Sequence, residues 1–289
     1  GAVYVYKPDQ GKLGLFDNLR REVDHRLLAN PEAVTIMARD GTRLPAYLTL
    51  PRGRGKRGLP MVLMPHGGPY RVRDELRYDD WVQLLANRGY AVLQPNFRGS
   101  GGYGQAFEDL GDGEIGRAMQ DDLDDATDWA VAQGIADPAR ICVVGGSYGG
   151  YAALWAVIRN PERYACAASW AGVTDFEQQL RYSLDYIGRR YRGDWKDKVR
   201  GEERGFDLDD VSAAQQVARL NRPVLLAHGN RDYVVPFSQF RRMEKAAKEA
   251  GKKLETLELN DGHGFSSSRN EQIWYDRLTE FLAEHNPPD

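Results

Sequence analysis

One serine of this chain stands in a setting that could make it a nucleophile. Ser147 lies between Gly145 and Gly149 in the pattern Gly-x-Ser-x-Gly, after the apolar run 140–144 and before the Ala- and Leu-rich run 148–158. In such an elbow the serine sits on a strained turn between a buried strand and a helix. Glycines are needed there because a Cβ would collide as strand and helix close together. The pattern alone would also fit a tight turn with an ordinary serine.

Candidates for the base and the acid that would activate this serine follow downstream. A serine hydroxyl is a weak nucleophile unless a base takes its proton and a third group orients that base. Asp232 lies just past the apolar run 223–229, and His263 lies in a glycine-flanked loop after the alternating run 254–259. The order Ser, Asp, His, each at the end of a strand, matches the alpha/beta-hydrolase arrangement. We therefore predict a Ser147–Asp232–His263 triad.

The same chemistry needs donors for the negative oxygen of a tetrahedral intermediate. The apolar run 61–65 continues into His66-Gly67-Gly68-Pro69, where glycine would let a backbone N–H approach a substrate oxygen closely. We expect the N–H groups of Gly68 and Tyr148 to form this oxyanion hole. His66 and His228 are interpreted as structural histidines that bond to their own loops, since buried histidines usually serve as satisfied polar groups.

Several motifs in this order resemble the catalytic domain of the prolyl oligopeptidase family of serine peptidases, and among its branches the acylaminoacyl peptidases. They are His-Gly-Gly-Pro at 66–69, Asn-Phe-Arg-Gly-Ser-Gly-Gly-Tyr-Gly at 96–104, Gly-Gly-Ser-Tyr-Gly-Gly-Tyr at 145–151, and Asp232 with His263. The similarity extends from about residue 32 to the C-terminus. It implies an alpha/beta-hydrolase fold, the same triad, and hydrolysis of short or N-acylated peptides. A carboxylesterase with this triad and a catalytically idle binding module are the alternatives.

The pattern of elements agrees with an α/β fold. Apolar strands alternate with amphipathic helices from residue 60 onward, which predicts an alpha/beta-hydrolase fold with a mostly parallel central sheet flanked by helices. The alternating runs 34–38 and 43–50 around Asp40-Gly41 predict an antiparallel hairpin of edge strands. Helices are expected at 78–87, 120–132, 148–158, 238–250 and 271–284.

A long segment rich in Tyr, Arg and Trp, from Asp175 to Arg219, interrupts this alternation. In this fold class such an insertion lies above the catalytic face and can wall a substrate pocket. Ordinary packing and surface charge are the alternative for each of its residues. The candidates for an apolar wall are Tyr182, Tyr186, Tyr191 and Trp195, and the candidates for binding a carboxylate are Arg189, Arg190 and Arg192.

Val234, two residues after the predicted acid, departs from the family pattern. The resemblance places an arginine or asparagine there, which would donate to a peptide carbonyl of the substrate. Because valine offers no donor, a peptide would lose one hydrogen bond, whereas a simple ester would lose nothing. We expect small acyl esters or single-residue acyl substrates to be favoured, unless Arg231 or one of the three arginines of the insertion reaches the same place.

Residues 1–31 are predicted to be an N-terminal extension, and 32–289 the catalytic domain. Larger members of the family, as the resemblance implies, carry an N-terminal β-propeller. About sixty residues before the first core strand are too few for blades of ~40–50 residues each. The apolar runs 2–6 and 13–16, on either side of the turn 7–12, instead look like an edge hairpin of the kind that closes a propeller. We expect the chain to be the catalytic part of a larger protein.

Composition limits the partners of the chain. Its 289 residues include 39 basic and 42 acidic ones, so the net charge of −3 gives no field for nucleic acid, and the basic stretch 52–57 is interpreted as a solvated loop. No run approaches the ~20 apolar residues of a membrane span, and no signal pattern is present at the N-terminus.

Cys142 and Cys166 lie inside apolar runs, where we expect them to pack unpaired. Unpaired cysteines would suit a reducing, cytoplasmic compartment.

Cofactor and metal chemistry is not expected. The five histidines are scattered, without the short ligand spacing of a zinc site. The acidic run 121–125 is interpreted as charge favoured at a helix start with a solvated face. No glycine-rich phosphate loop with a lysine is found. The predicted partner is a small peptide or ester substrate, with neither nucleic acid nor membrane, and self-association into a homo-oligomer is left open.

Overall fold

The computed structural model describes residues 2–18, 23–201 and 206–288. Its centre is an eight-stranded sheet in the order β10-β9-β8-β7-β5-β6-β4-β3. The strands are β3 (Pro31–Met37), β4 (Arg43–Thr49), β5 (Leu59–Leu63), β6 (Ala91–Pro95), β7 (Ala136–Gly146), β8 (Cys166–Trp170), β9 (Val224–Gly229) and β10 (Glu255–Leu259). All strands from β10 to β6 run parallel, and β3 and β4 form the antiparallel hairpin at one edge. This confirms the predicted fold class.

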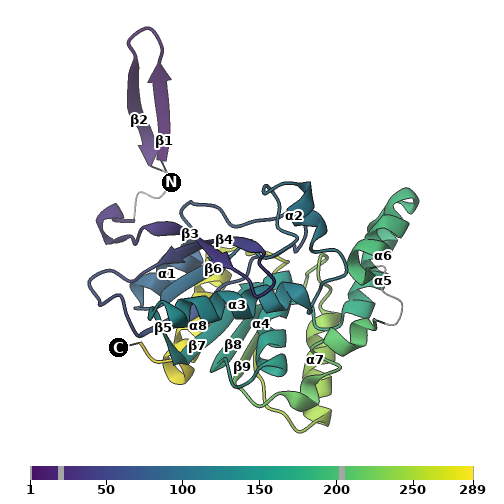
Figure 1. Ribbon diagram of the computed structural model, residues 1–289. Coiled ribbons are helices and arrows are strands. Elements are labelled where there is room, and N and C mark those ends of the chain that lie inside the picture. Colours follow the sequence, from purple (N-terminus) through teal and green to yellow (C-terminus); the bar gives the residue numbers. More distant parts are fainter. Residues whose placement is uncertain (1, 19–22, 202–205, 289) are drawn as a thin grey trace.

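Helices cover both faces of the sheet (Figure 1). Successive residues of a strand point to opposite faces. Leu63 and Val143 pack toward one helix layer, and Val62 and Cys142 toward the other. The first layer contains α3 (Ala118–Ala132), α4 (Tyr148–Arg159) and α7 (Ser238–Glu249), and the second contains α1 (Asp80–Asn87) and α8 (Ser268–His285).

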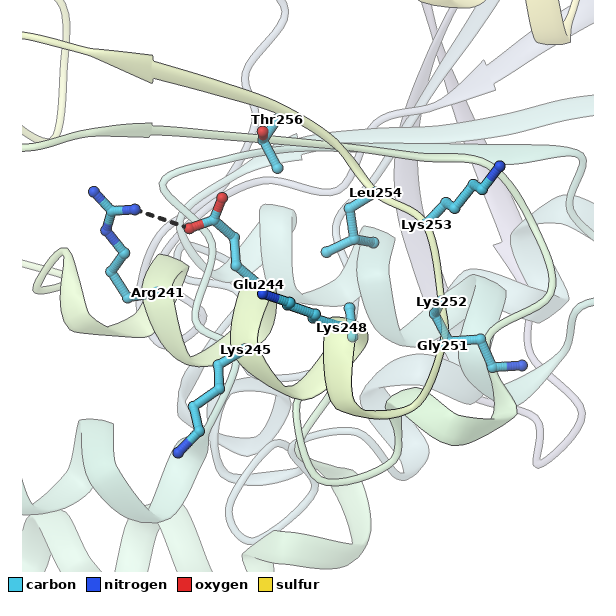
Figure 2. Close-up of a pocket in the computed structure, with 10 residues that line it drawn as sticks. Arg241, Glu244, Lys245, Lys248, Gly251, Lys252, Lys253, Leu254 and Thr256 are labelled. Atoms are coloured by element: carbon cyan, nitrogen blue, oxygen red, sulfur yellow. Dashed lines mark hydrogen bonds and ion pairs between the residues drawn. The ribbon is translucent and has the colours of Figure 1, made fainter.

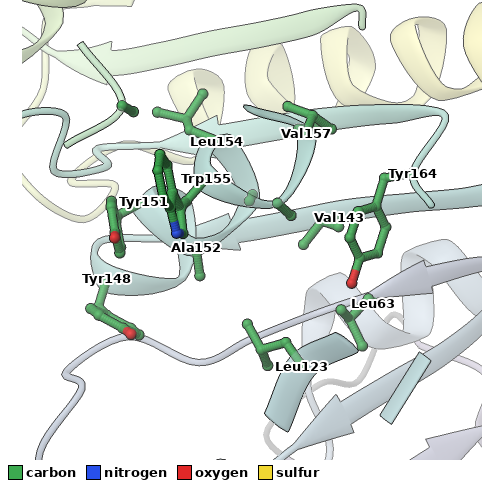
Figure 3. Close-up of a cluster of buried hydrophobic side chains, with 14 of the residues drawn as sticks. Leu63, Leu123, Val143, Tyr148, Tyr151, Ala152, Leu154, Trp155, Val157 and Tyr164 are labelled. Carbon is green, nitrogen blue, oxygen red and sulfur yellow. The ribbon is translucent and has the colours of Figure 1, made fainter. Parts of the chain in front are cut away.

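Helix α4 is held in the core along nearly its whole length, because every residue from 148 to 158 is buried. Figure 3 shows its side chains among apolar residues of the sheet and of α3. Its polar atoms have partners: the Tyr151 hydroxyl donates to Val211 O at 2.8 Å, and the Trp155 Nε1–H donates to Gly116 O at 2.8 Å. Buried aromatic donors usually require such acceptors. The helix that begins directly after Ser147 is therefore fixed on all sides.

Cys142 and Cys166 form a disulfide, so the expectation of unpaired cysteines is wrong. The two residues lie opposite each other in the register of β7 and β8, with Cα atoms 4.7 Å apart, which is within the range that a disulfide requires. Tertiary packing sets the register of two parallel strands joined by a helix. For this reason the spacing of 24 residues gave no sign of the pairing.

Two members of the acidic run 121–125 are buried and paired, so its interpretation as a solvated face is wrong for them. Asp122 lies 2.6 Å from the Arg98 guanidinium, which also bonds Asp40. Asp124 accepts a hydrogen bond of 2.7 Å from the Tyr164 hydroxyl. Arg98 belongs to the glycine-rich motif 96–104, and its ion pair ties this loop to α3.

Two parts of the chain stand apart from the layers (Figure 1). The insertion between β8 and β9 forms α5 (Phe176–Tyr186) and α6 (Arg192–Arg200). The N-terminal hairpin of β1 (Ala2–Lys7) and β2 (Lys12–Asn18) is a separate two-stranded sheet that projects from the body. Short helices complete the chain: η1 (His25–Leu27), α2 (Gln105–Asp109), η2 (Arg189–Tyr191), η3 (Leu208–Val211) and η4 (Val217–Arg219). No helix within the described ranges is long and apolar enough to cross a membrane.

Candidate active site

Ser147 stands on the turn between β7 and α4 with φ 58°, a conformation that residues with a side chain rarely adopt. Such a conformation costs about 1–3 kcal/mol and persists only where the surroundings fix it. Here the Ser147 N–H donates to Trp170 O at 2.9 Å, and α4 starts at the next residue. This is the strained strand-to-helix turn that the motif predicts.

The two motif glycines are required by close packing of backbone. A Cβ on Gly145 would lie 2.4 Å from the Gly149 carbonyl carbon, and a Cβ on Gly149 would lie 2.1 Å from Pro65 O. Gly145 thus allows α4 to close onto β7, as predicted. Gly149 has a second task that the motif did not reveal, because it lets the loop after β5 lie against the start of α4.

Asp232 and His263 are hydrogen bonded, with 2.7 Å between Asp232 Oδ2 and His263 Nδ1. The other carboxylate oxygen accepts from the N–H groups of Val234 at 2.8 Å and Val235 at 3.0 Å. Burial by itself raises the pKa of Asp232, but hydrogen bonds from His228 and His263 outweigh it and hold the pKa well below its usual value. The aspartate therefore stays ionised and can orient the imidazole.

Asp261 fixes the loops that carry these two residues. Its Oδ1 accepts from the N–H groups of Gly262 and Ser266, both at 3.0 Å, and its Oδ2 accepts from Asn270 at 2.9 Å. Its backbone oxygen accepts from the Arg231 N–H at 2.8 Å. Burial opposes ionisation of Asp261, yet the hydrogen bonds that its carboxylate accepts from Ser266, Asn270 and Gly262 lower its pKa to about 2. Sequence reasoning missed this residue, although an Asp-Gly pair is a signal for such a turn.

Trp170, at the end of β8, links the serine to the histidine loop. Its backbone oxygen accepts from the Ser147 N–H, and its Nε1–H donates to His263 O at 2.8 Å. The indole packs on Phe265, with ring centroids 4.2 Å apart. Among the described residues no hydrogen bond joins Ser147 Oγ to His263, so proton transfer between them stays a proposal. Catalytic hydrogen bonds often shorten only when substrate binds.

The two other buried histidines differ. His66 contacts its own loop: Nδ1 lies 2.6 Å from Gly67 O, Nε2 lies 2.8 Å from Ser100 Oγ, and burial lowers its pKa to about 4. For His228, the sequence predicts hydrogen bonds only within its own loop. Its Nε2 does lie 2.9 Å from Val235 O, but it also lies 3.3 Å from Asp232 Oδ2.

A cavity of about 190 Å³ opens beside Ser147. Gly68, Ser147 and Tyr148 lie together in its wall, and in the described part of the chain neither the N–H of Gly68 nor that of Tyr148 has a hydrogen-bond acceptor. The cavity is below the ~300–1,000 Å³ of a site for a drug-sized ligand, so it fits a single side chain. The remaining wall is mostly apolar and consists of Pro69, Tyr70, Ile115, Val173, Phe176, Gln179, Leu180, Ser183, Trp195, Val199, Val234 and Val235.

Comparison with known proteins identifies the family. The model of the prolyl oligopeptidase family matches residues 77–287. The chain belongs to this family. It is 33% identical, over 97% of its length and 42% of the relative's, to dipeptidyl aminopeptidase BIII of Pseudoxanthomonas mexicana. A puromycin-hydrolyzing peptidase of Mycobacterium tuberculosis has the same fold, with a TM-score of 0.86 and 24% identity over 100% of this chain and 44% of that one.

A second solved structure, the acylaminoacyl peptidase of Pyrococcus horikoshii, also shares the fold, with a TM-score of 0.84 and 20% identity. This likeness covers 99% of the present chain and 46% of that protein. The chain therefore spans less than half the length of these relatives. Within the prolyl oligopeptidase family it corresponds to the part with the alpha/beta-hydrolase fold.

Six of the predicted substrate contacts do not line the cavity of this family member. Val234 and Trp195 do line it. The six that do not are Tyr182, Tyr186, Tyr191, Arg189, Arg190 and Arg192. Four other residues of α5 line the cavity instead, namely Phe176, Gln179, Leu180 and Ser183. Tyr186 is 70% exposed, and the Tyr182 hydroxyl donates to Tyr233 O.

A larger cavity, of about 810 Å³, lies between the end of α7 and the start of β10 (Figure 2). Its wall is basic, with Arg241, Lys245, Lys248, Lys252 and Lys253, and Arg241 is paired with Glu244 at 3.2 Å. β10 begins at this cavity, whereas the candidate catalytic residues follow the C-terminal ends of the parallel strands. The cavity therefore lies at the N-terminal ends of the strands, away from the candidate active site.

Three residues of types that can bind metal ions lie at the same end of the strands. Glu255, Glu284 and His285 have ligand atoms within 4.8 Å of one another. Arg277 already pairs with Glu255, and His285 Nε2 lies 3.1 Å from the same carboxylate. Glu255 therefore already has an ion pair with Arg277 and a contact with His285, and neither requires a metal ion.

Proposed function

We propose that this chain is the catalytic part of a serine peptidase that cleaves short or N-acylated peptides through an acyl-enzyme intermediate. The observation that supports this most is the cavity beside Ser147, whose wall contains a strained serine and two N–H groups that have no acceptor among the described residues. The names of the similar proteins, a dipeptidyl aminopeptidase and an acylaminoacyl peptidase, point to the same class of reaction.

In the proposed reaction His263 takes the proton of Ser147 Oγ while the oxygen attacks the acyl carbon. The negative oxygen that forms accepts hydrogen bonds from the N–H groups of Gly68 and Tyr148. His263 then gives the proton to the leaving amine or alcohol as the bond to the acyl carbon breaks. Water, activated by the same histidine, releases the acyl group and restores the serine. Asp232 keeps Nδ1 of the imidazole protonated throughout.

The substrate side chain nearest the scissile bond is proposed to be apolar. The wall of the cavity offers Ile115, Phe176 and Leu180 but no charged side chain. A carboxylate or an ammonium group would lose its hydration there without gaining a partner. Side-by-side turnover of anilides that differ only in this side chain, apolar against charged, tests the assignment.

Labelling with a fluorophosphonate probe separates an enzyme from an idle binding module. The wild type should be labelled on Ser147, and Ser147→Ala should abolish both labelling and turnover while the fold is retained. Ser183→Ala, which removes another hydroxyl from the same cavity, is the matched control and should still label. A properly folded wild type that never reacts with the probe would contradict the proposal.

The ester alternative is tested at Val234. Val234 lines the cavity without a side-chain donor, and the Arg231 guanidinium donates to Asn260 O, while Arg189 lies outside the cavity wall. We expect Val234→Arg to raise kcat/KM on dipeptidyl anilides by about 10-fold or more, as one charge-assisted hydrogen bond would, and to leave p-nitrophenyl esters unchanged. Equal effects on both substrate types, or none on either, would contradict this role of Val234.

We further propose that the hairpin of β1 and β2, within the predicted N-terminal extension 1–31, belongs to the edge of another domain. The relatives are more than twice as long as the matched region, and the hairpin of β1 and β2 exposes large apolar side chains. The cytoplasmic location and self-association stay predictions. The disulfide of Cys142 and Cys166 removes the argument from unpaired thiols, since disulfides persist mainly in oxidising compartments. Thiol titration of protein from its native compartment would test the location.

A further inference from the structure

His228 is a buried polar residue that the proposed reaction does not use. It lies at the end of β9, four residues before Asp232, and both side chains are completely buried. Phe237 and Phe240 meet the imidazole edge to face, at 5.9 and 6.1 Å between ring centroids. Nδ1 is buried and has no hydrogen-bond partner in the part of the chain that the structure describes. Such an atom costs free energy, so a purely structural residue at this place would more simply be apolar.

The surroundings of Nε2 settle which ring nitrogen holds a hydrogen. Nε2 lies 2.9 Å from Val235 O and 3.3 Å from Asp232 Oδ2, and both of these atoms can only accept. Nε2 therefore bears the hydrogen and shares it between the two oxygens. The bond to Val235 alone would hold the turn, but the contact with Oδ2 reaches the carboxylate of the proposed triad.

With this contact the carboxylate of Asp232 is held at both oxygens. Oδ1 accepts from the backbone N–H groups of Val234 and Val235. Oδ2 accepts from His263 Nδ1 at 2.7 Å and faces His228 Nε2. Without His228, the only partner of Oδ2 in the described ranges is the imidazole that it has to orient. His263 gains and loses a proton in each cycle, so this partner changes its charge.

We propose that His228 is a positioning residue, whose Nε2–H fixes Oδ2 of Asp232 so that the carboxylate stays directed at His263 as the imidazole gains and loses its proton. This inference rests on the proposed function and assigns it a fourth side chain. Burial raises the pKa of Asp232, and the hydrogen bonds from His228 and His263 together reverse that effect. This fits a donor that acts on the ionised aspartate.

The test compares two substitutions of His228 in the whole chain. His228→Leu removes the donor, and His228→Gln keeps an N–H donor at about the reach of Nε2. We expect Leu to lower kcat by about 10- to 100-fold, as loss of one hydrogen bond to a charged group does, and to change KM less than about threefold. Gln should recover most of that loss.

The pH dependence of kcat/KM distinguishes a positioning role of His228 from an effect on protein stability. With one donor less, Oδ2 would attract the imidazolium of His263 more strongly, so the midpoint of the acid limb of kcat/KM should move to higher pH in His228→Leu. Asp261 and Arg231, charged residues of the same two loops, are unchanged in each variant. Phe240→Leu, which alters packing against the same imidazole, should lower the melting temperature and leave the midpoint in place.

Several results would overturn the inference. They are a folded His228→Leu with kcat within threefold of wild type, an unshifted midpoint, or a folded Gln variant no better than Leu. If Leu does not fold, His228→Asn replaces it, because the shorter amide stops short of Asp232, and equal rates for Asn and Gln would then count against the role. Wild type that shows neither turnover nor fluorophosphonate labelling would instead overturn the proposed function itself.

Discussion

Gly68 shows at the scale of one residue why the loop proposed to contribute to the oxyanion hole should tolerate little change. Its φ is 120°, and an added Cβ would lie 3.0 Å from the Val72 Cβ. Alanine could be accommodated only if the backbone turned, which would move the N–H away from the oxyanion position. We expect Gly68→Ala to lower kcat by about 100- to 1,000-fold, the usual loss for one such donor. Steady-state kinetics on an activated ester would measure it.

The control for this prediction is Gly41, in the hairpin of β3 and β4. It has a comparable φ of 87° and nothing within 4 Å of an added Cβ. Gly41→Ala carries the same conformational penalty, about 1 kcal/mol or more, but should keep wild-type kcat. Equal losses of kcat in both variants would show that stability, and not the oxyanion hole, explains the effect.

Residues whose role depends on their own side chain could be predicted at this scale, whereas those that act through other groups could not. Ser147, Asp232 and His263 could be proposed from the sequence because the chemistry of a triad requires those residue types at strand ends, and the structure shows the Asp232–His263 bond. Trp170 acts through its carbonyl and its indole N–H on two separate loops, and His228 acts across a turn. Neither arrangement leaves a pattern in the sequence, because it depends on how β8, β9 and the following loops pack.

At the scale of elements, the loop after Gly68 contains the carboxylate of Asp74, whose ionised form is disfavoured by burial in the folded protein. The Asp74 N–H donates to Asn96 Oδ1, and the Asp74 backbone oxygen accepts from Asn96 Nδ2. The Oδ2 of Asp74 is buried and has no partner among the described residues. Burial, with repulsion from Asp79, raises the pKa of Asp74 to about 7, against smaller effects of Gln94 and Arg77. The folded state therefore binds this proton more tightly than the unfolded chain, whose aspartates titrate near ~3.9.

The sign of the effect on stability follows from proton linkage. Between about pH 4 and pH 7 the folded state holds more protons than the unfolded state, so this group lowers the free energy of unfolding as pH rises. Asp74→Asn removes the titration. Its stability relative to wild type should therefore increase from pH 5 to pH 8, by at least about 1 kcal/mol in urea unfolding. Glu75→Gln, a change at a more exposed neighbour, is the control, and profiles of wild type and Asp74→Asn that run parallel would contradict the burial of Asp74.

The regular elements of the domain were predictable, because the alternation of strands and helices reflects the two faces of the sheet. The insertion was predicted as a pocket wall without its helices. Its aromatic and basic residues drew attention to Tyr182, Tyr186 and Arg189, while Gln179, Leu180 and Ser183 of α5 line the cavity. The orientation of α5 depends on contacts outside its own sequence, so the residue types alone could not indicate which of its side chains line the cavity.

For the whole molecule, the hairpin of β1 and β2 leads to a prediction about association. Tyr4 pairs with Leu15 and Tyr6 with Leu13 across its two strands. These four side chains, 58–65% exposed, form an apolar face on an isolated hairpin. A two-stranded sheet is marginal in water by itself, and exposed apolar patches usually mark contact surfaces. In the chain alone this face would be covered most simply by the same face of a second copy.

We therefore expect the purified chain to self-associate in a concentration-dependent way, measured by size-exclusion chromatography with light scattering. Leu13→Thr combined with Leu15→Thr keeps residues that favour strands but removes half of the apolar face, and should shift the protein to monomer. The matched control combines Met37→Thr and Leu76→Thr, which are 60% and 56% exposed on the body of the domain. It should leave association unchanged, since those side chains lie outside the hairpin. A wild type that is monomeric at every concentration, or a control that dissociates as completely as the hairpin variant, would show that this face does not mediate contact between copies.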